Sequence, residues 1–318
     1  MGRLASRFHH FWRVAGKKAS RRWLHWRLRG KPEAERLAAE RVLRGREQYR
    51  TLREADFVVV SFGKSGRTWL RVMLSHGLRL HYGLPGEEMI GFDNFHWLDR
   101  RVAKIFFTHD NYIVDYTGRE AGKQPFYDKR VLLLARDPRD TSVSNYFQWK
   151  FRMKPEKIKL NNYPPQGSPI GIFEYMMSPY AGGLAHVIDF LNHWAAEAGN
   201  IPSFQLLRYE DLKRDTAAAL RRVFNFLEVP LSEAHLQAAV EYGSYENMKR
   251  MEARNANRAL MSGRLAPRDR NNPDSYKVRR AKVGGYRDYL EDDQVAAVDR
   301  LVADTLDPFY GYGPGGAC

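Results

Sequence analysis

The chain has 318 residues, of which 43% are hydrophobic, and it carries a formal net charge of +15. This length fits one large α/β domain or two small ones, and no stretch of the sequence approaches the ~18 consecutive apolar residues of a membrane span. The single cysteine, Cys318, excludes an intrachain disulfide, and no Cys/His spacing typical of a metal site occurs. We therefore predict a cytoplasmic protein without a metal, whose basic character favours an anionic partner.

The N-terminal segment is strongly basic, because residues 1–32 contain ten Lys or Arg and no acid. On a helical wheel its apolar residues share one face, which is typical of a helix that binds an anionic membrane surface. An ordinary amphipathic helix packed on the protein core would have the same pattern. No nucleic-acid recognition module is apparent, so we expect no nucleic-acid partner. The face consists of Leu4, Phe8, Phe11, Trp12, Ala15, Ala19, Trp23 and Trp26.

Strand-like and helix-like patterns alternate after this segment. We set a basic helical segment, 1–54, apart from a larger domain, 55–318. The alternation predicts an α/β fold with a mostly parallel sheet. Residues 152–171 and 252–285 are rich in Lys, Arg, Asn and Pro, and their length indicates functional loops. The predicted strands are 57–62, 104–108, 130–135 and 204–208; the predicted helices are 33–56, 68–80, 138–151, 184–198, 217–227 and 292–304.

Three of the predicted strands are followed by residues that could bind a ligand or take part in catalysis. These are 64–69 after the first strand, His109 after the second, and Arg136 after the third. Ligands of parallel sheets bind beyond the carboxyl ends of the strands, so these residues are expected to meet. In SFGKSGRTW the backbone N–H groups at a helix start would cradle an anion, with Lys64 adding a positive charge. The lysine precedes the second glycine, which differs from the G-x-x-x-x-G-K-[ST] order of a nucleotide kinase.

The segment ARDPRDTSVS follows the third strand and offers a second phosphate site. Arg136 ends the strand and Ser144 lies two turns into the next helix, so the two can converge on one phosphate. A structural alternative pairs Arg136 with Asp137 and leaves Arg139 and Asp140 in solvent.

Five segments of the sequence resemble the cytosolic-type sulfotransferases, and they occur in the order found in that family: KSGRTWL, RDPRDTSVS, LRYEDL, SYENMKR and VRRAKVGGYRDYL. The resemblance covers about residues 55–312. It implies a P-loop-like three-layer fold and 3′-phosphoadenosine-5′-phosphosulfate (PAPS) as co-substrate. It also implies a nucleotide site composed of Lys64, Ser65, Gly66, Arg67, Thr68, Trp69, Arg136, Ser144, Tyr209, Ser244, Met248, Arg279 and Arg280.

The same resemblance implies catalytic roles for His109, Lys64 and Ser144, with His109 as the base. A neutral imidazole can accept the proton of a hydroxyl or amine, and Lys64 can stabilise charge on the bridging oxygen. The sequence departs from the family at several positions. Arg67 replaces a threonine, Phe107 stands where a lysine is common, and Ala281 replaces a glycine; Gly285 and Tyr286 replace an aspartate and a tryptophan.

The resemblance also implies an acceptor that is a small molecule or lipid with a hydroxyl or amine. Residues 81–100 and 152–180 are candidate pocket loops, and their aromatic content would suit an apolar or glycosidic acceptor. With the basic N-terminal segment, this makes a lipid or glycolipid at the membrane surface a hypothesis. A P-loop kinase and a non-catalytic anion- or membrane-binding protein stay as alternatives, and the oligomeric state is open. The aromatic residues are Phe92, Phe95, Trp97, Tyr163, Phe173 and Tyr175.

Overall fold

The computed structural model describes residues 2–254 and 265–313. Cys318 and part of the predicted loop 252–285 lie outside these residues. Within the described chain a four-stranded sheet has the order β2-β1-β3-β4, and all three neighbouring pairs are parallel. The strands are β1 (Phe57–Val60), β2 (Ile105–Thr108), β3 (Arg130–Ala135) and β4 (Ser203–Arg208). The sequence therefore predicted the position of each strand to within a few residues.

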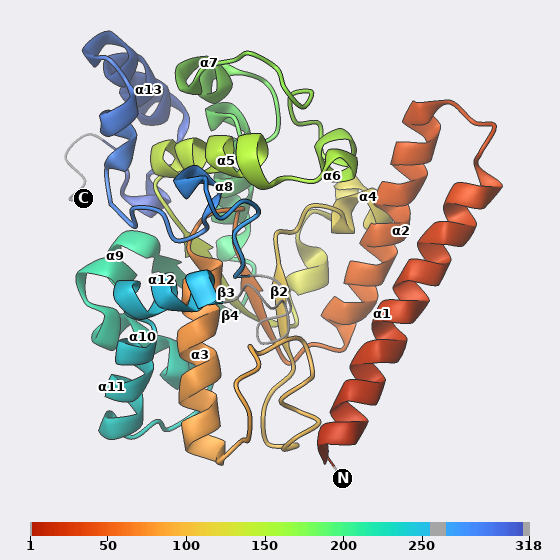
Figure 1. Ribbon diagram of the computed structural model, residues 1–318, viewed down its shortest axis with the longest axis vertical. Coiled ribbons are helices and arrows are strands. Elements are labelled where there is room, and N and C mark those ends of the chain that lie inside the picture. The colour runs from red at the N-terminus through yellow and green to blue at the C-terminus, as the bar shows by residue number, and fades with distance from the viewer. Residues whose placement is uncertain (1, 255–264, 314–318) are drawn as a thin grey trace.

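The sheet is covered by helices on both faces (Figure 1). Val59 and Leu132 point to one face and pack with side chains of α3, α10 and α11. Val58 and Leu133 point to the other face and pack with side chains of α2, α4 and α8. Strands buried on both faces need continuous apolar runs, which is why FVVV and VLLLA lack polar residues. The predicted three-layer α/β fold is confirmed.

The α-helices agree with the predicted ones where these exist, and several short helices in loops were not predicted. Among them, α6 lies within the segment 152–171, which was expected to be irregular. The α-helices are α1 (Gly2–Arg27), α2 (Glu33–Arg53), α3 (Arg67–Tyr82), α4 (Ile113–Thr117), α5 (Pro138–Arg152), α6 (Pro155–Leu160), α7 (Ile172–Met177), α8 (Leu184–Ala198), α9 (Tyr209–Arg214), α10 (Thr216–Phe226), α11 (Glu233–Tyr242), α12 (Tyr245–Arg254) and α13 (Asp292–Thr305). The 3₁₀ turns are η1 (Arg119–Ala121), η2 (Gln124–Phe126), η3 (Pro273–Ser275), η4 (Gly285–Tyr289) and η5 (Pro308–Tyr310).

Helices α1 and α2 form a long pair along one side of the molecule (Figure 1). Arg21 of α1 pairs with Glu47 of α2 at 2.5 Å. Helix α2 in turn packs closely on α4, because a Cβ atom at Gly45 would lie 2.2 Å from the carbonyl oxygen of Tyr112. The division at residue 54 stays a prediction.

The outer face of α1 leaves three tryptophans in solvent: Trp12, Trp23 and Trp26 are 59%, 56% and 64% exposed. The part of the chain that the structure describes contains no helix of the length and apolarity that crossing a bilayer demands. A helix packed on the core would bury these rings, whereas a helix that binds a membrane surface would expose them. The three tryptophans are exposed and do not cover the core.

Candidate active site

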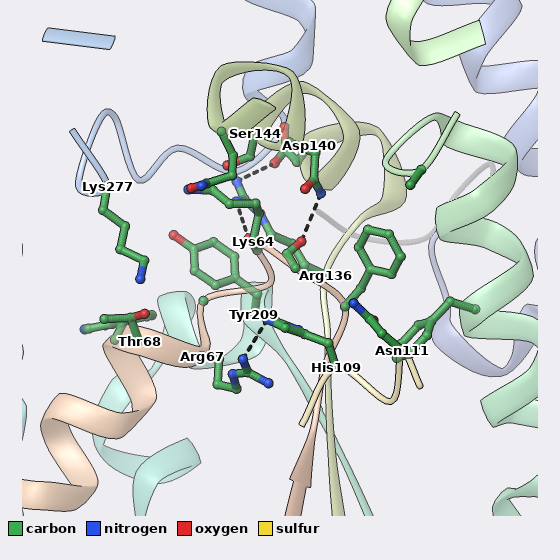
Figure 2. A pocket seen from close by; sticks show the side chains of 18 of the residues that line it. Lys64, Arg67, Thr68, His109, Asn111, Arg136, Asp140, Ser144, Tyr209 and Lys277 are labelled. Atoms are coloured by element: carbon green, nitrogen blue, oxygen red, sulfur yellow. Dashed lines mark hydrogen bonds and ion pairs between the residues drawn. The ribbon is translucent and has the colours of Figure 1, made fainter. Parts of the chain in front are cut away.

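A cavity of about 1250 Å³ opens at the carboxyl ends of β1, β2 and β3. Figure 2 shows its centre, where side chains from the loop after β1, the end of β2, helices α5 and α9 and the segment near Lys277 face one another. The three strand ends identified in the sequence thus meet, as parallel strands require.

The loop between β1 and α3 turns on two residues with left-handed backbone, Lys64 with φ 76° and Gly66 with φ 93°. Glycine is required at 66 for a second reason, since a Cβ atom there would lie 2.6 Å from the ring of Tyr209. Two side chains fix the loop from outside. Asn145 donates to the carbonyl oxygen of Gly63 at 3.0 Å, and Arg136 donates to that of Lys64 at 3.2 Å.

Lys64 lies among other positive charges in the cavity. Burial lowers the pKa of Lys64 well below its usual value, and the charge of Lys277 lowers it further. Burial likewise lowers the pKa of Lys277 to about 7, with a further contribution from Arg152. Two buried amines whose charges repel each other are the electrostatic complement of a bound polyanion, which would favour protonation of both.

Arg136 joins the phosphate loop to the C-terminal part of the chain. Its guanidinium lies over the ring of Tyr209 at 4.4 Å and donates to the carbonyl oxygen of Lys282 at 3.2 Å. Asp140, which is buried, lies 3.4 Å from Arg136. Asp140 also accepts from the backbone N–H groups of Gly284 and Tyr286, at 2.9 and 3.0 Å. Asp140 therefore anchors the basic segment 279–286 over the site.

The alternative in which Arg139 and Asp140 are solvated is wrong. Arg139 is buried, and its guanidinium pairs with Asp137 at 2.6 Å and with Asp299 at 2.5 Å. Buried ions need such partners because an unpaired charge is costly away from water. These contacts tie the start of α5 to α13 and leave Arg136 on the cavity side.

An aromatic wall borders the opposite side of the loop. The rings of Trp69 and Tyr209 meet edge to face at 5.8 Å, and the Trp69 indole N–H donates to the carbonyl oxygen of Gly243 at 2.7 Å. Met248 packs beside Trp69 in a small apolar cluster. Aromatic faces of this kind can hold a nucleobase by stacking.

His109 lies at the end of β2 in a defined tautomer. Its Nδ1 is 2.7 Å from the carbonyl oxygen of Ser61, which can only accept, so Nδ1 carries the proton. Its Nε2 is 2.6 Å from Nη2 of Arg67 and accepts from it (Figure 2). Burial lowers the pKa of His109 well below its ordinary value, and the charge of Arg67 lowers it further. The imidazole is therefore neutral at pH 7, as a general base must be.

Of the predicted site residues, all but Ser65 and Ser244 line the cavity. Ser65 is a buried residue of the loop, and the Ser244 hydroxyl accepts from the N–H of Asn247 at the start of α12. Arg279 lies over the ring of Phe147 at 3.4 Å, and Arg280 pairs with Asp288 at 3.1 Å. The functional roles of these residues stay predictions.

The departures from the family pattern have structural consequences. Ala281 adopts a left-handed backbone with φ 50°, which a glycine would occupy without a steric penalty. Tyr286 is buried, and its hydroxyl donates to Asp299 at 2.7 Å. Phe107 lines the cavity and receives the guanidinium of Arg71 at 4.3 Å from its ring.

The predicted aromatic acceptor pocket is mostly wrong, because only Tyr163 of the six aromatic residues lines the cavity. Phe95 and Tyr175 are fully buried core residues, while Phe92 and Phe173 pack against core clusters. Their side chains fill the interior under the loops, where apolar burial is most favourable. The loop 152–180 does reach the cavity, but with basic residues that include Lys154 and Lys157.

Sequence reasoning missed Lys277, whose amine points into the cavity (Figure 2), and the supporting residues Asp140 and Asn145. The Lys/Arg-rich composition of 252–285 was the signal for Lys277. Among the described residues, no cluster of His, Cys, Asp or Glu is arranged to hold a metal ion.

Comparison with known proteins agrees with this geometry. The chain is 25% identical over 280 residues to cytosolic sulfotransferase 15 of Arabidopsis thaliana, covering 80% of this chain and 72% of that protein. It is 23% identical to an amine sulfotransferase of Oryctolagus cuniculus, covering 81% of this chain and 83% of that protein. The structure of mouse sulfotransferase SULT7A1 complexed with PAP superposes with a TM-score of 0.54 at 21% identity, covering 81% of this chain and 89% of that one. Residues 54–309 match the family model described as the sulfotransferase domain, and the chain therefore belongs to the sulfotransferase family.

Proposed function

We propose that the protein transfers a sulfuryl group from PAPS to a hydroxyl or amine of an acceptor, with His109 as the base. One observation carries the proposal. Lys64, Arg136 and the neutral imidazole of His109 follow three different strands in the sequence, and all three line one cavity. The donor is polyanionic, so it fits a cavity whose buried amines repel one another. A structurally similar protein, retinol dehydratase, superposes with a TM-score of 0.51, and its structure was solved in complex with retinol and PAP.

The residues divide the work as follows. Lys64 and the N–H groups at the start of α3 hold the 5′ end of the donor, and Arg136 with Ser144 binds its 3′-phosphate. Trp69 and Tyr209 hold the adenine. When bound, PAPS supplies an activated sulfuryl group: the acceptor oxygen or nitrogen forms a bond to sulfur, the bond from sulfur to the bridging oxygen breaks, and PAP leaves. His109 Nε2 takes the acceptor proton, and Lys64 stabilises the charge on the leaving oxygen.

Binding of PAP (3′-phosphoadenosine 5′-phosphate) tests this function without knowledge of the acceptor. We expect calorimetry to give a Kd for PAP at least about 10-fold below that for adenosine 5′-phosphate, because a charged hydrogen bond contributes ~1.5–3 kcal/mol. Equal affinities for the two nucleotides would contradict the proposal. Magnesium-dependent turnover of ATP would instead favour the kinase alternative.

We also propose that the protein is cytoplasmic and that α1 binds an anionic membrane surface, where a lipid or glycolipid acceptor would be presented. The support is the set of exposed rings at Trp12, Trp23 and Trp26 on a helix without acids. Rings of this type insert at the headgroup level while nearby cations attract anionic lipid.

Vesicle sedimentation tests the membrane proposal. Full-length protein is expected to sediment with phosphatidylcholine vesicles that contain phosphatidylserine, and less so at high salt. Replacing Trp12, Trp23 and Trp26 with alanine should abolish sedimentation, whereas Phe309→Ala, which removes an exposed ring outside α1 (42% exposed), should not. Equal sedimentation of the triple variant and the unaltered protein would overturn the proposal.

A further inference from the structure

Arg67 occupies the atom of His109 that the reaction needs. His109 Nε2 has one lone pair, and it accepts from Nη2 of Arg67 at 2.6 Å. The other ring nitrogen cannot substitute, because its proton is held by the carbonyl oxygen of Ser61 at 2.7 Å. An acceptor hydroxyl can therefore donate to His109 only after the Arg67 side chain has moved.

The surroundings of Arg67 indicate what would move it. Among the residues that the structure describes, fifteen Lys or Arg but four Asp or Glu line the cavity, so its wall attracts anions. Two of the acids are already paired with cations: Asp140 lies 3.4 Å from Arg136, and Asp110 lies 2.5 Å from Lys123. An anion that enters beside Arg67 would thus meet mainly positive charge.

Lys157 of α6 contributes to this positive wall, and its charge is one of those that lower the pKa of His109. Burial in the cavity lowers the pKa of Lys157, and the charges of Arg44 and, more weakly, Arg67 lower it further. Helix α6 is held in place by Arg41 of α2, which donates to the carbonyl oxygen of Leu160 at 3.1 Å. The position of Lys157 is therefore built into the fold.

We propose that the acceptor carries a carboxylate or phosphate group, that Arg67 and Lys157 bind this anion, and that the new contact draws Arg67 off His109 Nε2. Binding of an anionic acceptor would thus free His109 Nε2 to act as the base, whereas a neutral acceptor would leave Nε2 bound to Arg67. A guanidinium favours this exchange, since its hydrogen bonds to an anion are stronger than that to an imidazole. This inference rests on the proposed sulfuryl transfer and specifies its acceptor class.

The contact also accounts for two departures of this sequence from its family. The resemblance implies a threonine at position 67, which could not bring a charge to His109, and a lysine at position 107, where this chain has a phenylalanine. The cation near the base is thus carried by the phosphate loop. A side chain that starts at the first residue of α3 can swing without moving His109, which follows β2 and is held by the carbonyl oxygen of Ser61.

A matched pair of phenols tests the inference on enzyme saturated with PAP. The probes are 3-(4-hydroxyphenyl)propanoate and its amide, whose reactive hydroxyls are alike and whose charges differ. We expect calorimetry to show the carboxylate binding about 10- to 100-fold more tightly, the range of one or two charged hydrogen bonds. The ¹⁵N signal of His109 Nε2, assigned with His109→Gln, should shift on addition of the carboxylate and stay unchanged with the amide.

Three variants separate the anion site from general electrostatics. Arg67→Thr should bind both probes equally, and Lys157→Gln should lose part of the preference. Arg119→Gln removes an exposed cation from the same cavity wall and should keep the preference. With PAPS, Arg67→Thr should lower kcat/KM for the carboxylate while raising kcat for the amide, a reversal that a merely structural role would not produce.

Equal affinity for the two probes, no binding of the carboxylate, or an unchanged preference in Arg67→Thr would each overturn the inference. The circular dichroism spectrum of every variant serves as the check on folding, and its PAP affinity is measured alongside. If PAP binds in preference to adenosine 5′-phosphate but the carboxylate preference is missing, sulfuryl transfer stands and the anionic acceptor fails. If PAP shows no preference, it is the proposed function that fails.

Discussion

Replacing His109 with glutamine is expected to lower kcat/KM for sulfuryl transfer by roughly 10²- to 10⁴-fold, the usual contribution of a general base. Glutamine retains polar atoms near Ser61 and Arg67 but cannot take the acceptor proton. PAP affinity should stay within about 3-fold, because the glutamine amide can replace the hydrogen bonds that His109 makes to the carbonyl oxygen of Ser61 and to Arg67. Steady-state kinetics and calorimetry on the same preparation measure both quantities.

His193→Gln is the matched control, since His193 lines the same cavity at an exposed position and pairs with Asp189 at 3.3 Å. Its kcat/KM should remain close to that of the unaltered protein. Turnover by His109→Gln at the level of this control would show that another group accepts the proton, and the mechanism would need a different base.

The pH profile of kcat/KM adds a second test of His109. Burial and the charge of Arg67 lower its pKa, so the neutral form persists below the ordinary histidine pKa of ~6.5. Activity should therefore hold as the pH falls through 6.5 and decline only where this lowered pKa is reached. A decline centred at or above the ordinary value would place the base in a more exposed or less cationic site.

The sheet and the meeting of the strand ends were predictable because they depend on short-range signals. Runs such as FVVV and VLLLA fit only buried parallel strands, and parallel strands bring their carboxyl ends together wherever their order falls. Lys64, His109 and Arg136 each follow such a run directly. Their convergence could thus be inferred without knowing the order β2-β1-β3-β4, which the sequence did not supply.

Side-chain directions in loops were not predictable, because they depend on contacts between segments far apart in the sequence. Arg67 could have faced the nucleotide side, yet the approach of β2 to the loop sets it against His109. Phe95 and Tyr175 were predicted to line a pocket because aromatic residues in loops often bind ligands, but both side chains are buried in the core beneath the loops. Asp140 was expected to be solvated in one alternative, but its carboxylate is buried and accepts hydrogen bonds from the backbone of Gly284 and Tyr286.

Replacing Arg136 with alanine is expected to remove the preference for PAP over adenosine 5′-phosphate. PAP affinity should fall by about 10- to 100-fold or more, since the charged hydrogen bonds to the 3′-phosphate are lost. Affinity for adenosine 5′-phosphate should fall less. Its decrease measures the structural effect of the replacement on the loop, because Arg136 also donates to the carbonyl oxygens of Lys64 and Lys282. The ratio of the two Kd values therefore isolates the 3′-phosphate from the structural effect.

Lys213→Ala is the control for this ratio, because Lys213 lines the cavity 5.9 Å from the ring of Trp69 on the adenine side. It should weaken both nucleotides alike and leave the ratio unchanged. Arg136→Lys distinguishes charge from geometry: a lysine keeps the charge but lacks the planar fork of donors with which the guanidinium reaches two carbonyl groups and a phosphate, so we expect an intermediate ratio. A ratio unaltered in Arg136→Ala would mean that the 3′-phosphate is bound elsewhere, with Arg279 and Arg280 on the segment anchored by Asp140 as the next residues to replace.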